Sequence, residues 1–346
     1  MQIIISAGGT GTRLWPLSTS RQPKQFSPII DEQTLIKKTY NRLVKQIPIK
    51  NIWISTNEKY IDWIEKCIPG FDPAKIIVEP AKKDTFAATC ANAAIVASRT
   101  SRDETIINIQ ADAFIHAEDE DQYLQALHKI DLAITQGEFD MMTLAIKPFF
   151  PNIGLGYLEV DAQNKESVFE NPALVTRFTE KPTLEIANKF IEQGNYFWHW
   201  GTYSFTFNKL IEQVSKLQPE SLDLVEKIFR TSQIDFETYN QFPKMALEFA
   251  ITEKLKSLGV LALDIFWDDI GTWKTVYNYL PNLHEHTALE LAGSGNKIKS
   301  NTSGRKVAFV GVSDLLLVET EEGILVINPE MHAEVKKVAE YFDKGN

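Results

Sequence analysis

Apolar and polar positions alternate with two different periods along the first part of the chain. Short apolar runs, typical of buried strands, are followed by longer segments in which apolar side chains recur every three or four positions, as on one face of a helix. The expected strands are Ile3–Ser6, Ile52–Ser55, Ile76–Val78, Thr105–Ile109 and Met141–Ile146, and the expected helices span 34–46, 84–99 and 119–136. This alternation predicts an α/β fold with a mainly parallel sheet flanked by helices.

The pattern changes in the middle of the chain and again near its end. Between residues 154 and 273, shorter strands ("GYLEV", "VTRFTEKP", "YSFTF", "VLALDIFW") mix with helices that begin near Thr183 and Pro219, so we expect a mixed sheet there. A Gly/Ser/Asn-rich link follows Pro281, and after it come three short strands and a closing helix. We therefore predict two domains, residues 1–280 and a small strand-rich domain of residues 281–346.

Composition narrows the partners and the compartment. The 346 residues carry a formal net charge of -10, and this acidity disfavours binding to phosphate backbones, which needs broad basic surface. Cys67 and Cys90 lie in unrelated segments without metal-binding or redox spacing, which fits a reducing compartment. The apolar run Ile3–Ala7 is too short for a signal peptide, and no apolar stretch approaches the length of a membrane span. We expect a cytoplasmic protein with no nucleic-acid and no membrane partner.

A glycine-rich turn, Gly8–Arg13, follows the first expected strand directly and is the first candidate site. The turn would then lie at the carboxyl edge of the sheet, where open α/β sheets bind ligands. Glycines also let backbone N–H groups approach an anion closely. The turn is neither a Walker A loop nor a dinucleotide fingerprint, because no Gly-Lys-Ser/Thr follows and Leu14 stands at the third glycine position. Taken alone, the glycine-rich turn fits equally well a tight connection between a strand and the following loop, without any bound ligand. However, Arg21 and Lys24 follow Arg13 with no acidic residue through Ile30, which favours a polyphosphate ligand.

The stretch "AGGTGTRLWPLSTSRQPKQF" resembles the signature of the sugar-nucleotide pyrophosphorylases, and "TRLWPLS" with "PKQF" resembles their mannose-1-phosphate guanylyltransferase branch. The resemblance continues in the family's order over nearly the whole chain, through "EPAKKDTFAA", "QAD", "GLGYLEV", "RFTEKP", "YFWHWGTYSF", "FAITEK", "FWDDIGTW" and "GVSDLLLVET". It implies a Rossmann-like (GT-A-like) catalytic domain and a C-terminal β-helix-like extension, for which we expect a role in a homodimer contact. It also implies transfer of GMP from GTP to mannose 1-phosphate.

The resemblance further implies a Mg²⁺ ion held by Asp112 and Asp269, which each follow an expected strand. An aspartate at such a place is otherwise more often a turn or helix-cap residue. Mg²⁺ commonly takes one or two protein carboxylates together with phosphate oxygens and water. The family's spacing, with Trp267, Gly271 and Trp273 around Asp269, distinguishes this aspartate from its neighbour Asp268.

Other site residues also follow from the resemblance. Those on the nucleotide side are Ala7, Gly8, Gly9, Gly11, Thr12, Arg13, Lys24, Glu79, Asp84 and Thr85. Those on the sugar-phosphate side are Gly154, Glu180, Lys181 and His199. Catalysis is expected from Arg13, Lys24, Asp112, Lys181 and Asp269. An ionised phosphate is its own nucleophile, so the expected reaction needs no general base and no covalent intermediate.

Departures from the family pattern leave two alternatives open. Leu155 stands where a tyrosine is usual, and His199 and Trp200 replace asparagine and serine, so the hexose pocket is altered and His199 is either a sugar contact or a packing residue. On the base side, Gln110 and the run Lys83–Thr85 depart from the family's residues. The chain could therefore act on another hexose- or heptose-1-phosphate. It could also be an inactive regulatory subunit that binds nucleotide sugars, although the intact candidate catalytic residues argue against this.

Overall fold

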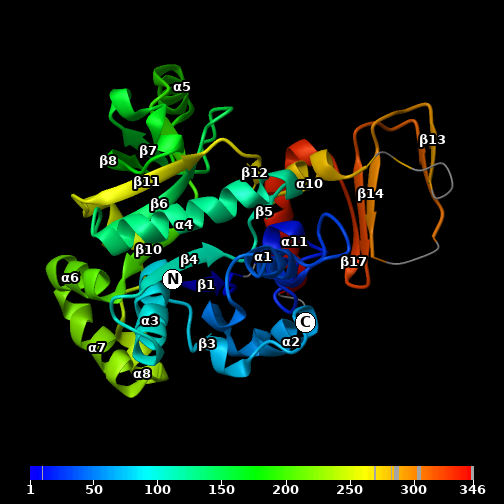
Figure 1. The fold of residues 1–346 in the computed structure, drawn as a ribbon. Helices are drawn as coiled ribbons and strands as arrows, with labels where there is room; N and C mark the ends of the chain where they lie inside the picture. Colours follow the sequence, from blue (N-terminus) through cyan, green and yellow to red (C-terminus); the bar gives the residue numbers. More distant parts are fainter. Residues whose placement is uncertain (10, 269, 282, 284–287, 302–304, 344–346) are drawn as a thin grey trace.

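The computed structural model describes residues 1–9, 11–268, 270–281, 283, 288–301 and 305–343. Within these ranges ten strands form one sheet, in the order β11-β8-β7-β9-β6-β10-β4-β1-β2-β3 (Figure 1). The strands are β1 (Gln2–Ser6), β2 (Ile52–Asn57), β3 (Ile76–Glu79), β4 (Thr105–Gln110), β6 (Met141–Ile146), β7 (Tyr157–Val160), β8 (Ala173–Thr179), β9 (Tyr196–His199), β10 (Tyr203–Thr206) and β11 (Leu258–Leu263).

The sheet changes from parallel to mixed along its width, as the sequence predicted. β4, β1, β2 and β3 run parallel to one another, and β6 is parallel to β11. The remaining pairs of the sheet are antiparallel. The carboxyl ends of the four parallel strands therefore meet at one edge, where Ser6 lies opposite Gln110 and Asn57 opposite Glu79. This edge is where an open α/β sheet binds its ligand.

Helices cover both faces of this sheet because successive strand residues point to opposite faces. Ile3 and Ile5 of β1 pack in one core, with α1 (Leu35–Leu43), α2 (Ile61–Cys67) and α4 (Glu120–Gln136). Ile4 packs in the other. That second core contains α3 (Asp84–Arg99), α6 (Phe207–Leu217) and α7 (Leu222–Thr231). The two cores hold the site edge rigidly between them.

The structure also contains elements that the hydrophobic pattern did not reveal. The buried strand β9 lies between β7 and β6, and β5 (Phe114–Ile115) pairs with β12 (Trp267–Asp268) in a two-stranded sheet. Such short strands lack a period long enough to recognise in the sequence. The remaining α-helices before residue 281, among the described residues, are α5 (Leu184–Gln193), α8 (Phe236–Gln241), α9 (Leu247–Ala250) and α10 (Trp273–Tyr279). None of the described helices is long and apolar enough to cross a membrane.

The C-terminal part contains five described strands rather than the three expected. They are β13 (Ala288–Leu291), β14 (Lys297–Ser300), β15 (Val307–Val310), β16 (Leu316–Thr320) and β17 (Gly323–Ile327). β13 and β14 were missed because charged residues interrupt their short sequences, ALEL and KIKS, so neither forms an apolar run. β13 pairs in parallel with β15, and β14 with β16, as in the coils of a β-helix.

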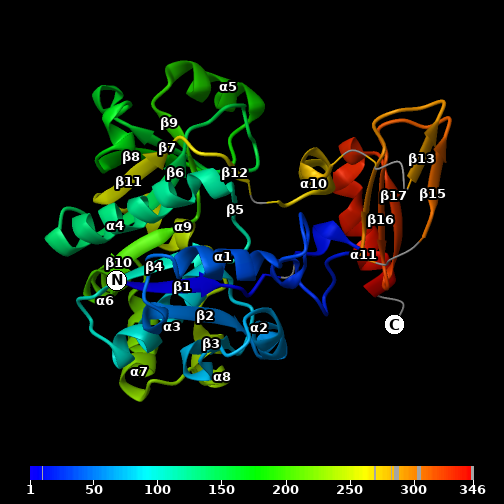
Figure 2. The same ribbon diagram turned by 45° about the vertical axis from the view of Figure 1, so that its right-hand side comes forward.

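The last helix, α11 (Val335–Asp343), returns to the N-terminal part of the chain (Figure 2). Both views place the C-terminal sheets to one side of the main sheet, beyond α10. Val335 and Ala339 pack in one apolar cluster with Leu14 and Trp273. The division of the chain near residue 281 stays a prediction, since this cluster joins residues from both sides of it.

Candidate functional site

The glycine turn lies at the carboxyl end of β1 and needs glycine for two physical reasons at Gly11. Its φ of 56° lies in the left-handed region, which L side chains rarely adopt. A Cβ built on Gly11 would also overlap the Cβ of Lys24. The turn and the segment that carries Lys24 are therefore in direct backbone-to-side-chain contact, which only glycine permits.

Gln25 and Ser18 fasten the carbonyl groups of this turn. The buried Gln25 amide donates from Nε2 to the carbonyl oxygens of Ala7, at 2.6 Å, and Gly9, at 2.9 Å. The Ser18 hydroxyl donates to the Gly11 carbonyl at 2.8 Å. Because the carbonyls are held from the protein side, the turn presents its peptide N–H side to a ligand. Ser18 and Gln25, in the segment after the turn, therefore hold the glycine turn in place through these hydrogen bonds.

Three basic side chains, those of Arg13 at the end of the turn and of Arg21 and Lys24 after it, have different surroundings. Arg13 lies on a short 3-10 helix (Thr12–Leu14) with an exposed guanidinium that has no ion-pair partner in the described part of the chain. Thr12 is the first residue of that helix. Lys24 is buried, and its Nζ lies 2.9 Å from Asp112 Oδ2. Arg21 is exposed, and its carbonyl accepts a hydrogen bond from the Trp63 indole at 3.0 Å.

A first cavity, which we name the glycine-turn cavity, has a volume of about 330 Å³. Residues from the ends of three strands (β1, β3 and β4), from the glycine turn and from the start of α3 line it. They are Ser6, Gly8, Gly9, Glu79, Lys82, Lys83, Asp84, Thr85, Ala88, Thr89, Asn108 and Gln110. Five of the predicted nucleotide-side residues, Gly8, Gly9, Glu79, Asp84 and Thr85, therefore line a single cavity. Ala7 lies beside it, while Arg13 and Lys24 are not part of its lining.

Glu79 is a half-buried acid of the glycine-turn cavity. Burial raises its pKa, while hydrogen bonds from Ser55, Asn92 and Tyr239 oppose this rise by favouring the carboxylate. Ser55 Oγ donates to Oε1 at 2.5 Å, whereas Oε2 receives a long bond of 3.4 Å from Tyr239. A Cβ added to Gly8 would come within 3.8 Å of that Oε2. The carboxylate therefore stands close to the glycine turn with acceptor capacity to spare.

Asp84 and Thr85 open helix α3 in an unusual backbone conformation. Asp84 has φ 67°, which is uncommon for a residue with a side chain, and its Oδ1 accepts a hydrogen bond of 2.8 Å from the Thr85 N–H. Lys181 and Ile270, in two other predicted site segments, also have positive φ values, 44° and 43°. Such strain persists where the surrounding structure imposes it and often marks functional sites.

A second cavity, the His199 cavity, has a volume of about 260 Å³ and lies at the other end of the site. Its lining combines polar groups with large apolar side chains. The residues are Gln110, Asp112, Ala113, Gly154, Leu155, Gly156, Glu180, His199, Trp200, Gly201, Glu248 and Trp267. Gly154, Glu180 and His199 from the predicted sugar side therefore meet Asp112. Gln110 lines both cavities, so they are neighbours.

His199 is a neutral imidazole with one nitrogen left unsatisfied. Its exposed fraction is 7%, and desolvation lowers its pKa from 6.5 to about 4, although the nearby Glu180 carboxylate opposes the shift. The rings of Phe178 and Tyr203 pack against it, with centroid distances of 5.1 and 5.2 Å. Nε2 is buried without a hydrogen-bond partner among the described residues. Because a buried polar atom normally finds a partner, this nitrogen is suited to a ligand group.

Glu180 and Lys181 differ in their relation to the His199 cavity. Glu180 lines it, whereas Lys181 is largely exposed and lies outside the lining. The Lys181 Nζ contacts Glu180 Oε1 at 2.7 Å. The lysine thus stands at the rim, where an exposed ion pair of this kind contributes little stability and can open readily.

Asp112 satisfies the requirements of a Mg²⁺ ligand, while Asp269 lies outside the described residues. Asp112 lies just after β4, lines the His199 cavity and has a partly exposed carboxylate. No cluster of three His, Cys, Asp or Glu side chains suited to a metal is found in the part of the chain that the structure describes. One or two carboxylates with phosphate oxygens and water are enough for Mg²⁺, so the donor set fits this ion.

Gln110 and Glu248 are two of the cavity residues to which the sequence prediction gave no binding or catalytic role. Gln110 belongs to the "QAD" motif, and its Nε2 donates to the Gly201 carbonyl at 3.2 Å, which closes one wall between the cavities. Glu248 precedes "FAITEK" and lines the His199 cavity. Only the spatial approach of α9 to the sheet edge reveals Glu248, because its surrounding sequence reads as an ordinary short helix.

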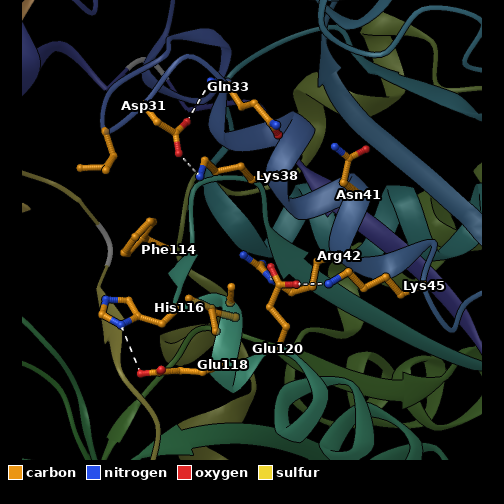
Figure 3. Close-up of a pocket in the computed structure, with 13 residues that line it drawn as sticks. Asp31, Gln33, Lys38, Asn41, Arg42, Lys45, Phe114, His116, Glu118 and Glu120 are labelled. Atoms are coloured by element: carbon orange, nitrogen blue, oxygen red, sulfur yellow. Dashed lines mark hydrogen bonds and ion pairs between the residues drawn. The ribbon is translucent and has the colours of Figure 1, made fainter.

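A third cavity, next to α1, is larger, at about 460 Å³, but its charges are already neutralised (Figure 3). Arg42 and Lys45 both contact Glu120, at 3.2 and 2.6 Å, and Lys38 pairs with Asp31. None of the predicted site residues that the structure describes lines this cavity. The candidate functional site is therefore formed by the two neighbouring cavities, the glycine-turn cavity and the His199 cavity. Their polar side chains keep hydrogen-bonding capacity for a ligand.

The chain resembles known proteins over most of its length. A family model described as nucleotidyl transferase matches residues 2–286. A xanthan biosynthesis protein, XanB, of Xanthomonas campestris is 30% identical, over 97% of this chain and 72% of that protein. A mannose-1-phosphate guanylyltransferase of Escherichia coli K12 is also 30% identical, with the same coverage of both chains. The fold matches a crystal structure titled mannose-1-phosphate geranyltransferase from Thermus thermophilus, with a TM-score of 0.86, 24% identity and coverage of 99% of each chain.

Proposed function

Because the chain belongs to the nucleotidyl transferase family, we propose that it transfers GMP from GTP to mannose 1-phosphate, giving GDP-mannose and pyrophosphate. The observation that carries the proposal is the pair of cavities that share Gln110 at the carboxyl edge of the sheet. One cavity contains the glycine turn and the half-buried Glu79 carboxylate, and the other contains polar groups suited to a sugar. Two substrates bound side by side in this way would react without moving far.

The glycine-turn cavity is the proposed nucleotide site. The Glu79 carboxylate can accept the two neighbouring N–H groups on the Watson–Crick edge of guanine, whereas adenine presents a ring nitrogen acceptor at the same place. Gly8 and Gly9 would bring backbone N–H groups to the phosphates. Arg13 and Lys24 would neutralise the pyrophosphate that leaves. This division of roles supports a preference for GTP.

The proposed reaction is an in-line attack by a phosphate oxygen of mannose 1-phosphate on the α-phosphorus of GTP. The bond to the β-phosphate oxygen breaks as the new bond forms, and pyrophosphate departs with the electron pair. Asp112 and Asp269 would hold Mg²⁺, which neutralises charge on the reacting phosphates. Lys181, at the rim of the His199 cavity, would reduce the repulsion between the two anionic substrates. The ionised phosphate needs no base to activate it.

A related sugar 1-phosphate is the alternative substrate. Leu155, His199 and Trp200 line the His199 cavity, and all three depart from the family pattern. These residues support a hexose with a less polar face as the competing sugar. An inactive sensor is less well supported, since Lys24, Asp112 and the glycine turn retain a reactive arrangement.

The test is Mg²⁺-dependent pyrophosphate release with GTP and other nucleoside triphosphates, each paired with mannose 1-phosphate and related sugar 1-phosphates. We expect GTP with mannose 1-phosphate to give the highest kcat/KM. Asp269→Asn should abolish turnover, while Asp268→Asn, its matched neighbour, retains the Oδ1 acceptor used by the Ile270 N–H and should remain active. Binding of GDP-mannose without any pyrophosphate release would instead support the sensor.

A further inference from the structure

Glu248 is an acid of the sugar side to which the family resemblance gave no role. It lies in the first turn of α9, is half-buried and lines the His199 cavity together with Glu180 and His199. One of its oxygens, Oε1, accepts a hydrogen bond of 2.7 Å from the Tyr203 hydroxyl. The other, Oε2, has only a 3.5 Å contact with Thr85 Oγ1, at the outer limit of hydrogen bonding. The carboxylate therefore keeps acceptor capacity for a ligand.

Glu248 is held firmly by its neighbours. Tyr203 is buried, and its hydroxyl remains a donor because burial, together with the Glu248 carboxylate, raises its pKa well above 10. The Leu247 N–H donates to Thr85 Oγ1 at 2.8 Å, and the Phe86 N–H donates to the Met245 carbonyl at 3.2 Å. The segment that carries Glu248 is thus pinned to the start of α3, where Thr85 lines the glycine-turn cavity.

We propose that Glu248 binds the sugar by accepting a hydrogen bond from one of its hydroxyl groups, and that with Glu180 it selects a neutral, hydroxylated sugar ring. This inference rests on the proposed function. Three carboxylates, those of Asp112, Glu180 and Glu248, line the same cavity together with an uncharged imidazole, so an anionic ring substituent such as a uronate carboxylate would meet repulsion. The sugar hydroxyls, in contrast, are donors that match the free acceptors.

The attachment of Glu248 to Thr85 also links the two proposed substrate sites. The Thr85 hydroxyl accepts a hydrogen bond from the Leu247 N–H, and Thr85 is also a lining residue of the glycine-turn cavity. A nucleotide that orders the start of α3 would therefore order the Glu248 segment as well. Sugar affinity should depend on Glu248 directly, and nucleotide affinity should not.

The decisive variants are Glu248→Gln and Glu248→Asp, with Glu253→Gln as the matched control. Gln keeps an acceptor for Tyr203 but loses the charge, and Asp keeps the charge but withdraws it by one methylene. Glu253 is an exposed acid of the same segment and does not line the cavity. Steady-state kinetics should give at least a tenfold higher KM for the sugar phosphate in both Glu248 variants. The KM for GTP should stay within twofold, and Glu253→Gln should match the wild type.

A second readout compares mannose 1-phosphate with the corresponding uronic acid 1-phosphate. Wild type should discriminate strongly against the uronate, and Glu248→Gln should reduce that ratio of kcat/KM at least fivefold. Unchanged sugar KM, or an equal rise of both KM values, would overturn the proposal, because the residue would then be inert or merely structural. Should Glu248→Gln not fold, as judged by circular dichroism, Glu248→Asp decides by the same criteria.

The design separates the two claims. If wild type consumes another sugar 1-phosphate instead of mannose 1-phosphate, the proposed function fails and the variants are scored with that sugar. If wild type binds mannose 1-phosphate in calorimetry without turnover, the dissociation constants replace KM. A wild-type protein that neither binds nor consumes any sugar 1-phosphate of the panel overturns both claims.

Discussion

Individual residues of the site are tuned by burial more than by charge pairing. His199 is neutral because its imidazole is desolvated, and Glu79 has its pKa raised for the same reason. Lys24 and Asp112, in contrast, hold each other through a partly buried ion pair. The sequence named these four positions as candidates, but it could not give their protonation states, since a pKa depends on neighbours from distant segments, such as Phe178 beside His199.

His199 should make the stability of the protein depend on pH. Its pKa is lowered from 6.5 to about 4 in the folded protein, so below pH 6.5 the unfolded chain binds a proton that the folded protein excludes. The free energy of unfolding should therefore fall by about 2 kcal/mol from this group between pH 7 and pH 5. Urea unfolding of wild type and His199→Asn at both pH values measures the difference. Equal pH dependence in the two proteins would show that His199 does not titrate in this way.

Gly11→Ala should damage nucleotide binding through a local overlap. The new Cβ would collide with the Cβ of Lys24 at a position where φ is already positive, so the turn and the lysine must separate. We expect kcat/KM for GTP to fall at least tenfold. Gly70→Ala is the matched control, because Gly70 has φ 78° with no atom within 4 Å of the added Cβ. It should cost about 1 kcal/mol of stability and leave the GTP kinetics unchanged; equal kinetic loss in both variants would argue against a specific role of the turn.

At the scale of elements, the sequence predicted most of the parallel half of the sheet. The helix expected at 84–99 is α3, Asp84–Arg99, and the strand expected at Met141–Ile146 is β6 with the same bounds. Long periodic segments of this kind carry a clear signal. β9 carries no such signal in the sequence, because its four residues are all buried and show no alternation of apolar and polar positions. Nor could the sequence show that α9 brings Glu248 to the site, since that approach depends on tertiary packing.

A hydrogen bond between elements connects the glycine-turn segment with α10. The buried Trp273 indole donates from Nε1 to the Trp15 carbonyl at 2.9 Å. Trp273→Phe removes this donor and leaves a buried carbonyl unpaired, so the free energy of unfolding should fall by about 2 kcal/mol. Trp63→Phe loses a similar bond, to the Arg21 carbonyl, at an exposed place where water can replace the indole. Chemical denaturation should show less than about 0.5 kcal/mol for that control. A similar fall in the free energy of unfolding in both variants would mean that the buried hydrogen bond contributes no more stability than the exposed one.

At the scale of the whole molecule, the C-terminal part contacts the segment that follows the glycine turn. The ring of Phe342 on α11 stacks on Trp15, with a centroid distance of 5.1 Å and an interplanar angle of 11°. The Thr320 hydroxyl donates to the Pro16 carbonyl at 3.3 Å. The sequence predicted a separate strand-rich part, but it gave no sign that this part returns to the glycine turn, because the contact joins opposite ends of the chain.

Phe342→Ala should therefore affect the nucleotide more than the sugar phosphate. Loss of the stacked ring loosens Trp15, two residues beyond Arg13, and we expect the KM for GTP to rise three- to tenfold with little change for mannose 1-phosphate. Tyr341→Ala is the control, since Tyr341 is the more exposed neighbour, at 75% against 51%. Steady-state kinetics of both variants give the comparison. Equal effects on the two substrates would indicate a general loss of stability instead.

The central claim is that a phosphate oxygen of the sugar 1-phosphate is the nucleophile that attacks the α-phosphorus of GTP between the two cavities. The most direct test uses mannose 1-phosphate with ¹⁸O in its non-bridging phosphate oxygens, together with GTP, Mg²⁺ and the wild-type protein, followed by mass spectrometry. The account predicts that GDP-mannose retains all of the label and that pyrophosphate contains none. Label in pyrophosphate, or no nucleotide sugar at all, would contradict it.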